Sequence, residues 1–433
     1  MRVSRHRGRV AALTALAAVA VSGLTACSGD DRIKLTVQVF GGAGFGYEDL
    51  VKEYEKDHPD IDVDYQIVTD DYDNEFRPQV LQWLEAGSGA GDVVGIEEQG
   101  VGQMMSLGDA WADLSEYGLD KRESDYPSWK WEQGHTADGK LAGLGTDVGG
   151  MAMCYRTDLF KKAGLPTDRE KVAELWQDWD GFTKAAKKFT DSDVDAAFVD
   201  SPNQLYNIRM VQEAGAADGI SYFDRKDKYV AGDTEAVRTA FDYVAELHEL
   251  GAVGQFENWS DEWNSAMQAG GFATMGCPAW MMGVIADTSG KENKGNWDVA
   301  QVPGGSGNWG GSWLGVPAQS DHPKEAAELA DYLTKPKSQV AAFEAISAFP
   351  STKEGQEDPK VADLSNEYFN DAPTGKLIAD SVKEFKPVYY GELHSAVRAA
   401  VEDVLFGLVQ GSYKHDEAWK EFVAAGQEVV DTA

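Results

Sequence analysis

The chain has 433 residues and a net charge of −34, with 73 acidic against 39 basic side chains. This acidic excess repels nucleic acid and anionic lipid headgroups, so the composition excludes both as partners. The acidic residues are scattered along the sequence, which favours solubility outside the cell over a role in cation binding. A chain of this length with ordinary hydrophobic content exceeds what one core supports, and we therefore expect two domains.

The first 27 residues have the pattern of a secretion signal. Four arginines precede an apolar run from Val10 to Val21, which is too short to span a bilayer as a mature helix. The run ends in Leu24-Thr25-Ala26-Cys27, which resembles the lipobox of bacterial lipoproteins and implies a diacylglyceryl group on the Cys27 thiol. We expect residues 1–27 to be a signal peptide with a lipidated cysteine and residues 28–32 to be a tether. The alternative is an unmodified signal peptide with an incidental cysteine.

Alternating strands and helices are predicted from residue 33 onward. The expected elements are a strand at 33–40, a helix at 47–58, a strand at 61–69, a helix at 78–86 and a strand at 92–96. This order predicts a parallel sheet with helices on both faces. Ligands bind at the carboxyl ends of such strands, where the loops 41–46, 69–73 and 97–100 lie.

A second series of elements begins near Met151. It comprises predicted helices at 179–189, 203–213 and 234–250 and strands near 196–199, 297–303 and 313–317. From Pro323 onward the pattern is almost entirely helical, and no repeat of solenoid period is present. Apart from Cys27, only Cys154 and Cys277 occur, and the pattern allows either a disulfide or two buried free thiols.

Signatures of catalysis and of metal binding are weak. Gly305 to Gly310 fits G-x-G-x-x-G, but a strand follows instead of a helix, so we interpret it as a flexible loop. Asp70 to Glu75 lacks the glycine and the spacing of a calcium loop and is expected to be solvated. Glu97 and Glu98 could serve a glycosidase, yet adjacent strand residues point to opposite faces and cannot form the required pair. We expect no metal and no cofactor.

The 13 tryptophans point to a ligand, because several stand in glycine-rich loops, among them Trp280, Trp309 and Trp313. A sugar ring presents C–H groups on one face and hydroxyls around its rim, so it needs aromatic platforms beside carboxylates and amides. We expect Trp280 and Trp309 to contact a ligand. The tryptophans expected to pack in the core are Trp111, Trp176 and Trp419.

Several motifs, taken in order, resemble the extracellular solute-binding proteins of ABC sugar importers, the class that includes maltodextrin-binding protein. These motifs are the lipobox, Phe40-Gly41-Gly42, Gly91-Asp92-Val93-Val94, Gly139 to Met151, Tyr155 to Phe160, and Gly310 to Pro317. The resemblance implies an α/β, two-lobed periplasmic-binding-protein fold of type II, in which each lobe is a doubly wound sheet and a hinge joins the lobes. It places lobe 1 at 33–147 and 303–348, and lobe 2 at 148–302 and 349–433. The chain crosses between lobes near Asp147, Val302 and Phe349, and ligand is expected to close the hinge.

The resemblance also implies the ligand-binding residues. Glu98 and Asp147 would accept hydrogen bonds from sugar hydroxyls, and Trp280 and Trp309 would stack on the rings. At His394 the maltodextrin-binding proteins tend to place a tryptophan, which puts that contact in doubt. The full set is Phe45, Gly46, Glu97, Glu98, Gln99, Asp147, Trp280, Trp309, Gly310 and His394.

Residues 134–140 and 143–156 resemble cellobiose and cello-oligosaccharide binders of filamentous actinobacteria, so these sugars are the favoured ligand. Chitobiose, xylo-oligosaccharides and maltose stay open, since one contact separates epimers by only about 1–3 kcal/mol. The expected molecule is a monomeric, non-enzymatic receptor on the outer face of the cell membrane, held by its lipid and working with the membrane subunits of an ABC permease. The alternatives are a secreted glycoside hydrolase and a structural or adhesive lipoprotein.

Overall fold

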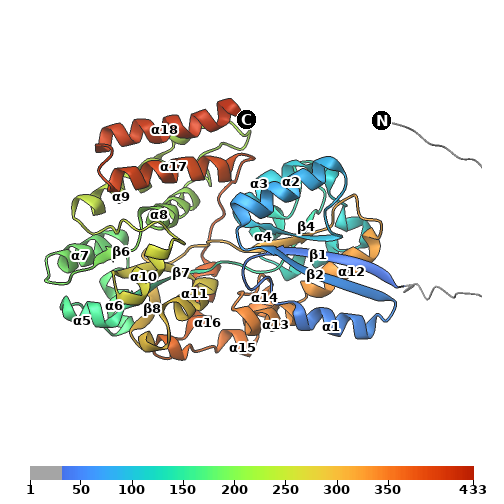
Figure 1. Ribbon diagram of the computed structural model, residues 1–433, viewed down its shortest axis with the longest axis horizontal. Coiled ribbons are helices and arrows are strands. Elements are labelled where there is room, and N and C mark those ends of the chain that lie inside the picture. The colour runs from blue at the N-terminus through green and yellow to red at the C-terminus, as the bar shows by residue number, and fades with distance from the viewer. Residues whose placement is uncertain (1–31) are drawn as a thin grey trace, which may run out of the picture.

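The computed structural model describes residues 32–433. The predicted signal peptide and the lipidated Cys27 lie outside the described residues, as does most of the predicted tether. The chain forms two lobes side by side, each built around its own sheet (Figure 1). None of the helices in residues 32–433 is long and apolar enough to cross a membrane.

The first sheet has the strand order β2-β1-β3-β9-β4. Its strands are β1 (Ile33–Phe40), β2 (Ile61–Thr69), β3 (Val93–Glu97), β4 (Gly143–Gly145) and β9 (Ser312–Gly315). β1 pairs in parallel with β2 and β3, as the sequence predicts, and β9 runs antiparallel to β3 and β4. In β1 the alternate residues Leu35, Val37 and Val39 are fully buried, which fixes the face that packs on the core.

The second sheet has the order β6-β7-β5-β8. Its strands are β5 (Met151–Arg156), β6 (Ala197–Val199), β7 (Phe272–Pro278) and β8 (Trp297–Gln301). β5 runs antiparallel to both of its neighbours, whereas β6 and β7 are parallel. The chain enters this lobe through β5 and leaves it through β8 at the same edge, so these two strands must run in opposite directions.

Helices surround both sheets. Those that follow or pack with the first sheet are α1 (Glu48–Asp57), α2 (Arg77–Ala86), α3 (Val101–Ser106), α4 (Ser128–Gln133), α12 (Pro323–Leu333) and α13 (Pro336–Ile346). Those around the second are α5 (Thr157–Lys162), α6 (Arg169–Leu175), α7 (Trp179–Thr190), α8 (Pro202–Ala216), α9 (Glu235–Glu249), α10 (Asp261–Ala269), α11 (Ala279–Ser289), α16 (Thr374–Lys383), α17 (His394–Val409) and α18 (His415–Thr432). The short α14 (Lys353–Glu357) and α15 (Pro359–Ala362) lie below the junction of the lobes in Figure 1.

Three segments that pass between the lobes are hydrogen-bonded to one another. The backbone N–H of Val148 donates to the carbonyl of Phe349 (2.8 Å), and Trp309 donates to Gly149 (2.8 Å). Isolated bridges pair Asp147 with Pro350 and Gly150 with Asn308. The segments near 147, 308 and 349 therefore cross as one bundle. The residue limits of the two lobes stay a prediction.

Cys154 and Cys277 are joined by a disulfide with an S–S distance of 2.08 Å. They lie on the adjacent antiparallel strands β5 and β7, and both are fully buried. Of the two arrangements that the sequence left open, the structure has the disulfide.

Candidate ligand-binding cleft

The carboxyl end of β3 carries three polar residues toward the junction of the lobes. The strand ends in a single 3₁₀ turn, η2 (Glu98–Gly100), which Glu97 caps by accepting from the N–H of Gln99 at its Oε2 (2.7 Å). Glu98 reaches the crossing segment, where its Oε2 accepts from the N–H of Gly310 (3.0 Å). A Cβ added to Gly310 would lie 3.8 Å from Oε1 of Glu97. Both carboxyl groups therefore approach Gly310. The expectation that they point to opposite faces is wrong, because the strand geometry stops at Glu97.

Burial raises the pKa values of the Glu97 and Glu98 carboxyl groups. It raises the pKa of Glu97 to about 8, and the negative charges of Asp73 and Glu98 raise it further. Burial also raises the pKa of Glu98 to about 7, against the opposing charge of Lys130. Near neutral pH these two side chains can therefore both donate and accept hydrogen bonds, which suits ligand hydroxyls.

Lys130 of α4 supplies a positive charge beneath the cluster. Its Nζ lies 3.1 Å from the centre of the Trp313 ring, and the side chain is almost fully buried. Burial lowers the pKa of Lys130 to about 8, while the charges of Asp147, Glu98 and Glu97 oppose that shift. The amine therefore offsets part of the negative charge that the carboxylates bring to the cleft.

Asp147 lies at the start of the first crossing segment. Its Oδ1 accepts from Oγ1 of Thr146 (2.7 Å) and from the N–H of Ser312 (2.8 Å), which holds the carboxyl group in place. Two other oxygens, Oε1 of Glu98 and Oε1 of Gln99, are buried without a hydrogen-bond partner within residues 32–433. A buried acceptor in that state costs about 1–3 kcal/mol, which a hydroxyl donor from a ligand would recover.

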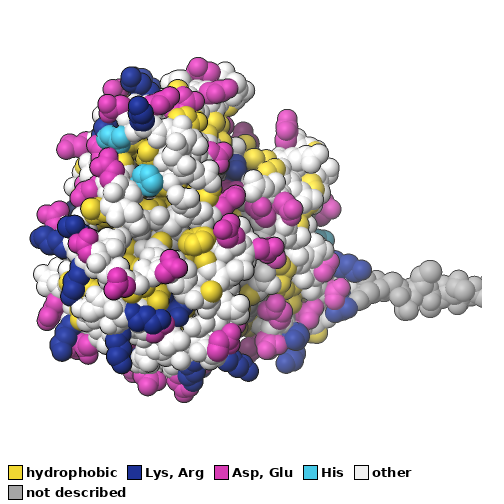
Figure 2. Space-filling model, turned by 60° about the vertical axis from the view of Figure 1, so that its left-hand side comes forward, with side chains coloured by type: hydrophobic (Ala, Val, Ile, Leu, Met, Phe, Trp, Pro, Cys, Tyr) yellow, Lys and Arg dark blue, Asp and Glu magenta, His cyan; other side chains and the backbone are white. Residues whose placement is uncertain are grey.

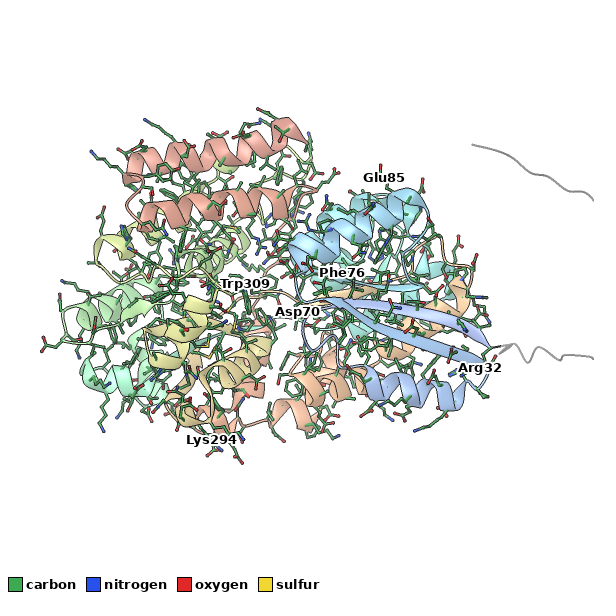
Figure 3. All side chains as sticks on the ribbon, in the orientation of Figure 1. Arg32, Asp70, Phe76, Glu85, Lys294 and Trp309 are labelled. Atoms are coloured by element: carbon green, nitrogen blue, oxygen red, sulfur yellow. A yellow bond between two sulfur atoms is a disulfide. The ribbon has the colours of Figure 1, made fainter. Side chains whose placement is uncertain are left out.

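Tryptophans from lobe 2 and from the crossing segment lie beside these polar groups. Trp280 lies in the first turn of α11 and donates from its Nε1 to the carbonyl of Trp309 (3.1 Å). Both side chains are partly exposed. Figure 3 shows Trp309 between the lobes, with Asp70 and Phe76 on the side of lobe 1. The aromatic rings and the carboxyl groups thus come from the start of α11, the crossing segment and the end of β3.

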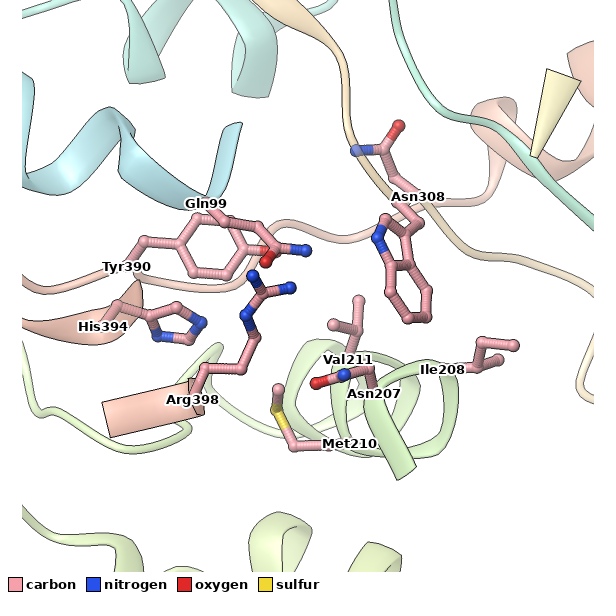
Figure 4. A pocket seen from close by; sticks show the side chains of 10 residues that line it. Gln99, Asn207, Ile208, Met210, Val211, Asn308, Tyr390, His394 and Arg398 are labelled. Atoms are coloured by element: carbon pink, nitrogen blue, oxygen red, sulfur yellow. The ribbon is translucent and has the colours of Figure 1, made fainter. Parts of the chain in front are cut away.

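A narrow cavity separates the lobes at this point (Figure 4). Its volume is about 10 Å³, which is room for about one water molecule, so the lobes nearly touch here. Its lining residues are Gln99, Asn207, Ile208, Met210, Val211, Asn308, Trp309, Tyr390, His394 and Arg398. In Figure 4 the guanidinium group of Arg398 points toward the side chain of Gln99.

His394 lies at the start of α17 and is almost fully buried against Tyr222 and Tyr390, with ring centres 4.9 and 4.5 Å away. Burial and the nearby charge of Arg398 lower the pKa of His394 to about 3, so the imidazole is neutral. Its Nδ1 has no hydrogen-bond partner within the described residues.

Two polar contacts join the lobes at the edge of this cavity. Arg398 of α17 pairs with Asp73, which lies in the π-helical turn η1 (Tyr72–Phe76), at 2.6 Å. The Oγ of Ser395 donates to the carbonyl of Gln99 (2.8 Å). These contacts hold α17 against η1 and the end of β3 in lobe 1.

The structure gathers most of the predicted site residues but places two of them elsewhere. Glu97, Glu98, Asp147, Trp280, Trp309 and Gly310 surround the crossing segments, and Gln99 and His394 line the cavity. Phe45 is buried in the core of lobe 1, where its ring contacts Phe40 (5.1 Å). Gly46 has a φ of +71° and packs on α13. Ligand contact by these ten residues stays a prediction.

Sequence reasoning missed several residues of the cleft, among them Lys130, Asn207, Asn308, Tyr390 and Arg398. Two local signals were available. Asn308 directly precedes Trp309, and Arg398 follows His394 by four residues, which places both on one face of a helix. Lys130 had no such signal, because only the fold brings α4 under the carboxyl groups. No group of three His, Cys, Asp or Glu side chains that could hold a metal occurs within residues 32–433.

A sequence profile of bacterial extracellular solute-binding proteins matches residues 49–368. An arabinooligosaccharide-binding protein of Bacillus subtilis (strain 168) is 26% identical over 389 residues, which cover 85% of each chain. A crystal structure of an extracellular solute-binding protein of family 1 has a TM-score of 0.84 and 34% identity, covering 92% of this chain and 100% of that one. The galacto-N-biose-/lacto-N-biose I-binding protein of an ABC transporter from Bifidobacterium longum has a TM-score of 0.76 at 20% identity, covering 93% of this chain and 98% of that one, which shows the fold.

The chain therefore belongs to the bacterial extracellular solute-binding proteins, and its two-lobed α/β fold is shared with the structures that it resembles, the sugar-binding protein of Bifidobacterium longum among them. It is a solute receptor that works outside the cytoplasm, and it is not an enzyme.

Proposed function

We propose that this protein is the substrate-binding component of an ABC sugar importer and that it captures an oligosaccharide between its lobes. The observation that carries the proposal is that Trp280 and Trp309 lie near the crossing segment, where Glu98 and Gln99 each bury an oxygen without a hydrogen-bond partner within residues 32–433. Aromatic faces and unsatisfied acceptors are what sugar rings and their hydroxyls need. The sugar-binding relatives support the same reading.

The favoured ligands are cellobiose and cello-oligosaccharides, on the sequence resemblance of residues 134–140 and 143–156. Arabino-oligosaccharides are the second candidate, because the Bacillus subtilis relative carries that name. Neither class carries charge, which agrees with a cleft where Lys130 and the carboxyl groups offset one another. Delivery to the membrane subunits of a permease and a lipid on Cys27 are parts of this proposal.

Isothermal titration calorimetry on the full chain tests the ligand. The panel is cello-, arabino-, xylo- and chito-oligosaccharides with maltose, and each sample is checked afterwards for intact sugar. We expect heat with one series and no cleavage. Absence of heat across the panel would move the ligand outside these sugars and contradict the favoured ligand. Tight binding of arabino-oligosaccharides alone would replace the favoured ligand. Release of the Cys27→Ala variant from the membrane fraction tests the lipid anchor.

A further inference from the structure

One large aromatic side chain near the cleft is exposed. Within residues 32–433 only Ile67 and Trp259 are exposed large hydrophobic residues, and Trp259 has the greater exposed fraction, 59% against 39%. A single exposed apolar side chain is common on protein surfaces, so the surroundings of Trp259 decide whether it marks a binding surface.

Trp259 lies beside Trp280, one of the two tryptophans of the candidate cleft. Its ring is nearly parallel to that of Trp280, with an interplanar angle of 20° and centres 6.0 Å apart. Trp280 is in turn hydrogen-bonded to the carbonyl of Trp309, which lines the interlobe cavity. The ring of Trp263 also lies near, with centres 5.4 Å apart and an interplanar angle of 51°, and Trp259 nevertheless keeps 59% of its surface exposed to solvent.

The loop that carries Trp259 is held firmly to the ligand-facing edge of the second sheet. The fully buried Asp200, which follows β6, accepts from Nδ2 of Asn258 (3.1 Å) and from Nε1 of Trp263 (3.0 Å). Ser201 donates to Oδ1 of Asn258 (2.7 Å). Asn258, directly before Trp259, and Trp263, four residues after it, are thus fixed by hydrogen bonds to Asp200 and Ser201, and the ring between them is held ready for a ligand.

The backbone of Trp259 is strained. Its φ is +71°, in the left-handed region that residues with a Cβ rarely adopt. Strain of this kind persists where the surrounding structure imposes it, and it gathers at ligand-binding sites. A role limited to capping α10 would need neither the strain nor the exposure, because Ser260 caps that helix by accepting from the N–H of Trp263.

We infer that Trp259 forms an outer aromatic subsite that stacks on an additional sugar ring, so the ligand that fits this protein best has at least three sugar units. This inference rests on the proposed function. In this arrangement the inner sugar rings lie by Trp309 and Trp280, and the third sugar ring lies against the exposed part of Trp259. A disaccharide is too short to reach the Trp259 ring. The Trp259 side chain therefore increases the affinity for longer sugars over that for disaccharides.

The test compares affinities for two sugar lengths. Calorimetry on the full chain measures cellobiose and cellotriose, or the matching arabino-oligosaccharides, for the wild type and for Trp259→Ala, Trp259→Phe and Trp419→Ala. We expect Trp259→Ala to weaken trisaccharide binding roughly threefold to tenfold and to leave disaccharide binding unchanged. Trp259→Phe keeps an aromatic face and should therefore retain most of the wild-type preference for the trisaccharide over the disaccharide. Trp419→Ala removes a partly exposed tryptophan of α18 and should leave both affinities unchanged.

The variant Trp259→Gly separates binding from folding. Glycine adopts a positive φ without strain, so this variant should unfold at an equal or higher temperature while losing the preference for the trisaccharide. Equal changes for both sugars, or a wild type that binds the trisaccharide no better than the disaccharide, would overturn the subsite and leave the proposed function intact. A wild type that binds no sugar would overturn both.

Discussion

At the scale of single residues, burial of the Glu98 carboxyl group makes stability depend on pH. Its pKa is about 7 in the folded chain and near 4.5 in the unfolded one. Between these values the folded state holds a proton that the unfolded state has lost, so the free energy of unfolding falls as pH rises. We expect Glu98→Gln to remove about 3 kcal/mol of that fall by pH 7. Urea denaturation from pH 4.5 to 8 measures it. The variant should still show some dependence of the unfolding free energy on pH, because Glu97 is also buried. A dependence equal to that of the wild type would contradict the burial of Glu98.

His394 gives the opposite dependence. Its pKa is about 3 in the folded chain against 6.5 when exposed, so below pH 6.5 the unfolded chain takes up a proton that the folded chain rejects. The resulting loss of stability is about 2 kcal/mol at pH 5. His394→Phe keeps the ring contacts with Tyr222 and Tyr390 and has nothing to titrate. Its stability from pH 5 to 7, measured by urea denaturation, should be flatter than that of the wild type.

The identity of the polar residues could be predicted from the sequence, but their chemical state could not. Glu97, Glu98 and Gln99 follow a predicted strand, and that position was enough to propose them. Their acidity depends on Lys130 and Asp73, which come from other segments and approach only in the folded chain. Phe45 shows the limit of this reasoning, because an aromatic residue in a glycine-rich loop can also pack in the core, and here its ring lies beside Phe40 while its ligand contact stays a prediction.

At the scale of elements, the crossing bundle leaves no space for a side chain at Gly149. A Cβ there would lie 1.7 Å from the carbonyl oxygen of Trp309, and neither backbone can move without breaking the hydrogen bonds between the crossings. We expect Gly149→Ala to destabilise the chain by about 3 kcal/mol, measured by urea denaturation, and to weaken ligand binding.

The matched control is Gly283→Ala in α11, where nothing lies within 4 Å of the added Cβ. Alanine favours a helix, so this variant should gain up to about 1 kcal/mol. Similar losses in both variants would show that the crossing bundle tolerates a side chain and would contradict the steric argument.

Predictability differs among the elements for physical reasons. Strands such as β2 and helices such as α9 carry their period in the local sequence, and the predicted limits agree with the structure within a few residues. The direction of β5 depends on where the chain enters and leaves lobe 2, which no local pattern encodes. The turn η1 places Asp73 through a π-helical geometry that hydrophobic periodicity does not signal.

At the scale of the whole molecule, acidic side chains are spread over the visible surface without gathering into one patch (Figure 2). Repulsion between the acidic side chains of the two lobes opposes their close approach. Specific attractive contacts between the lobes must outweigh this repulsion. The ion pair between Arg398 and Asp73 does so at the cleft, at 2.6 Å and with most of the arginine buried. Asp73 also lies 3.6 Å from Arg77 in its own lobe. The Asp73 carboxylate therefore contacts an arginine from each lobe.

We expect Asp73→Asn to favour separated lobes and to weaken ligand binding, because the guanidinium of Arg398 would lose its partner in lobe 1. Loss of a charged hydrogen bond costs about 1–2 kcal/mol, which corresponds to roughly fivefold to thirtyfold in the dissociation constant. Calorimetry measures the affinity, and small-angle scattering should give a larger radius of gyration without ligand. Asp191→Asn is the control, since it removes an exposed carboxylate paired with Lys187 inside lobe 2 and should change neither quantity. If Asp73→Asn lowered the stability of lobe 1 but left affinity and radius unchanged, the pair would be a local contact and closure would have to come from the ligand alone.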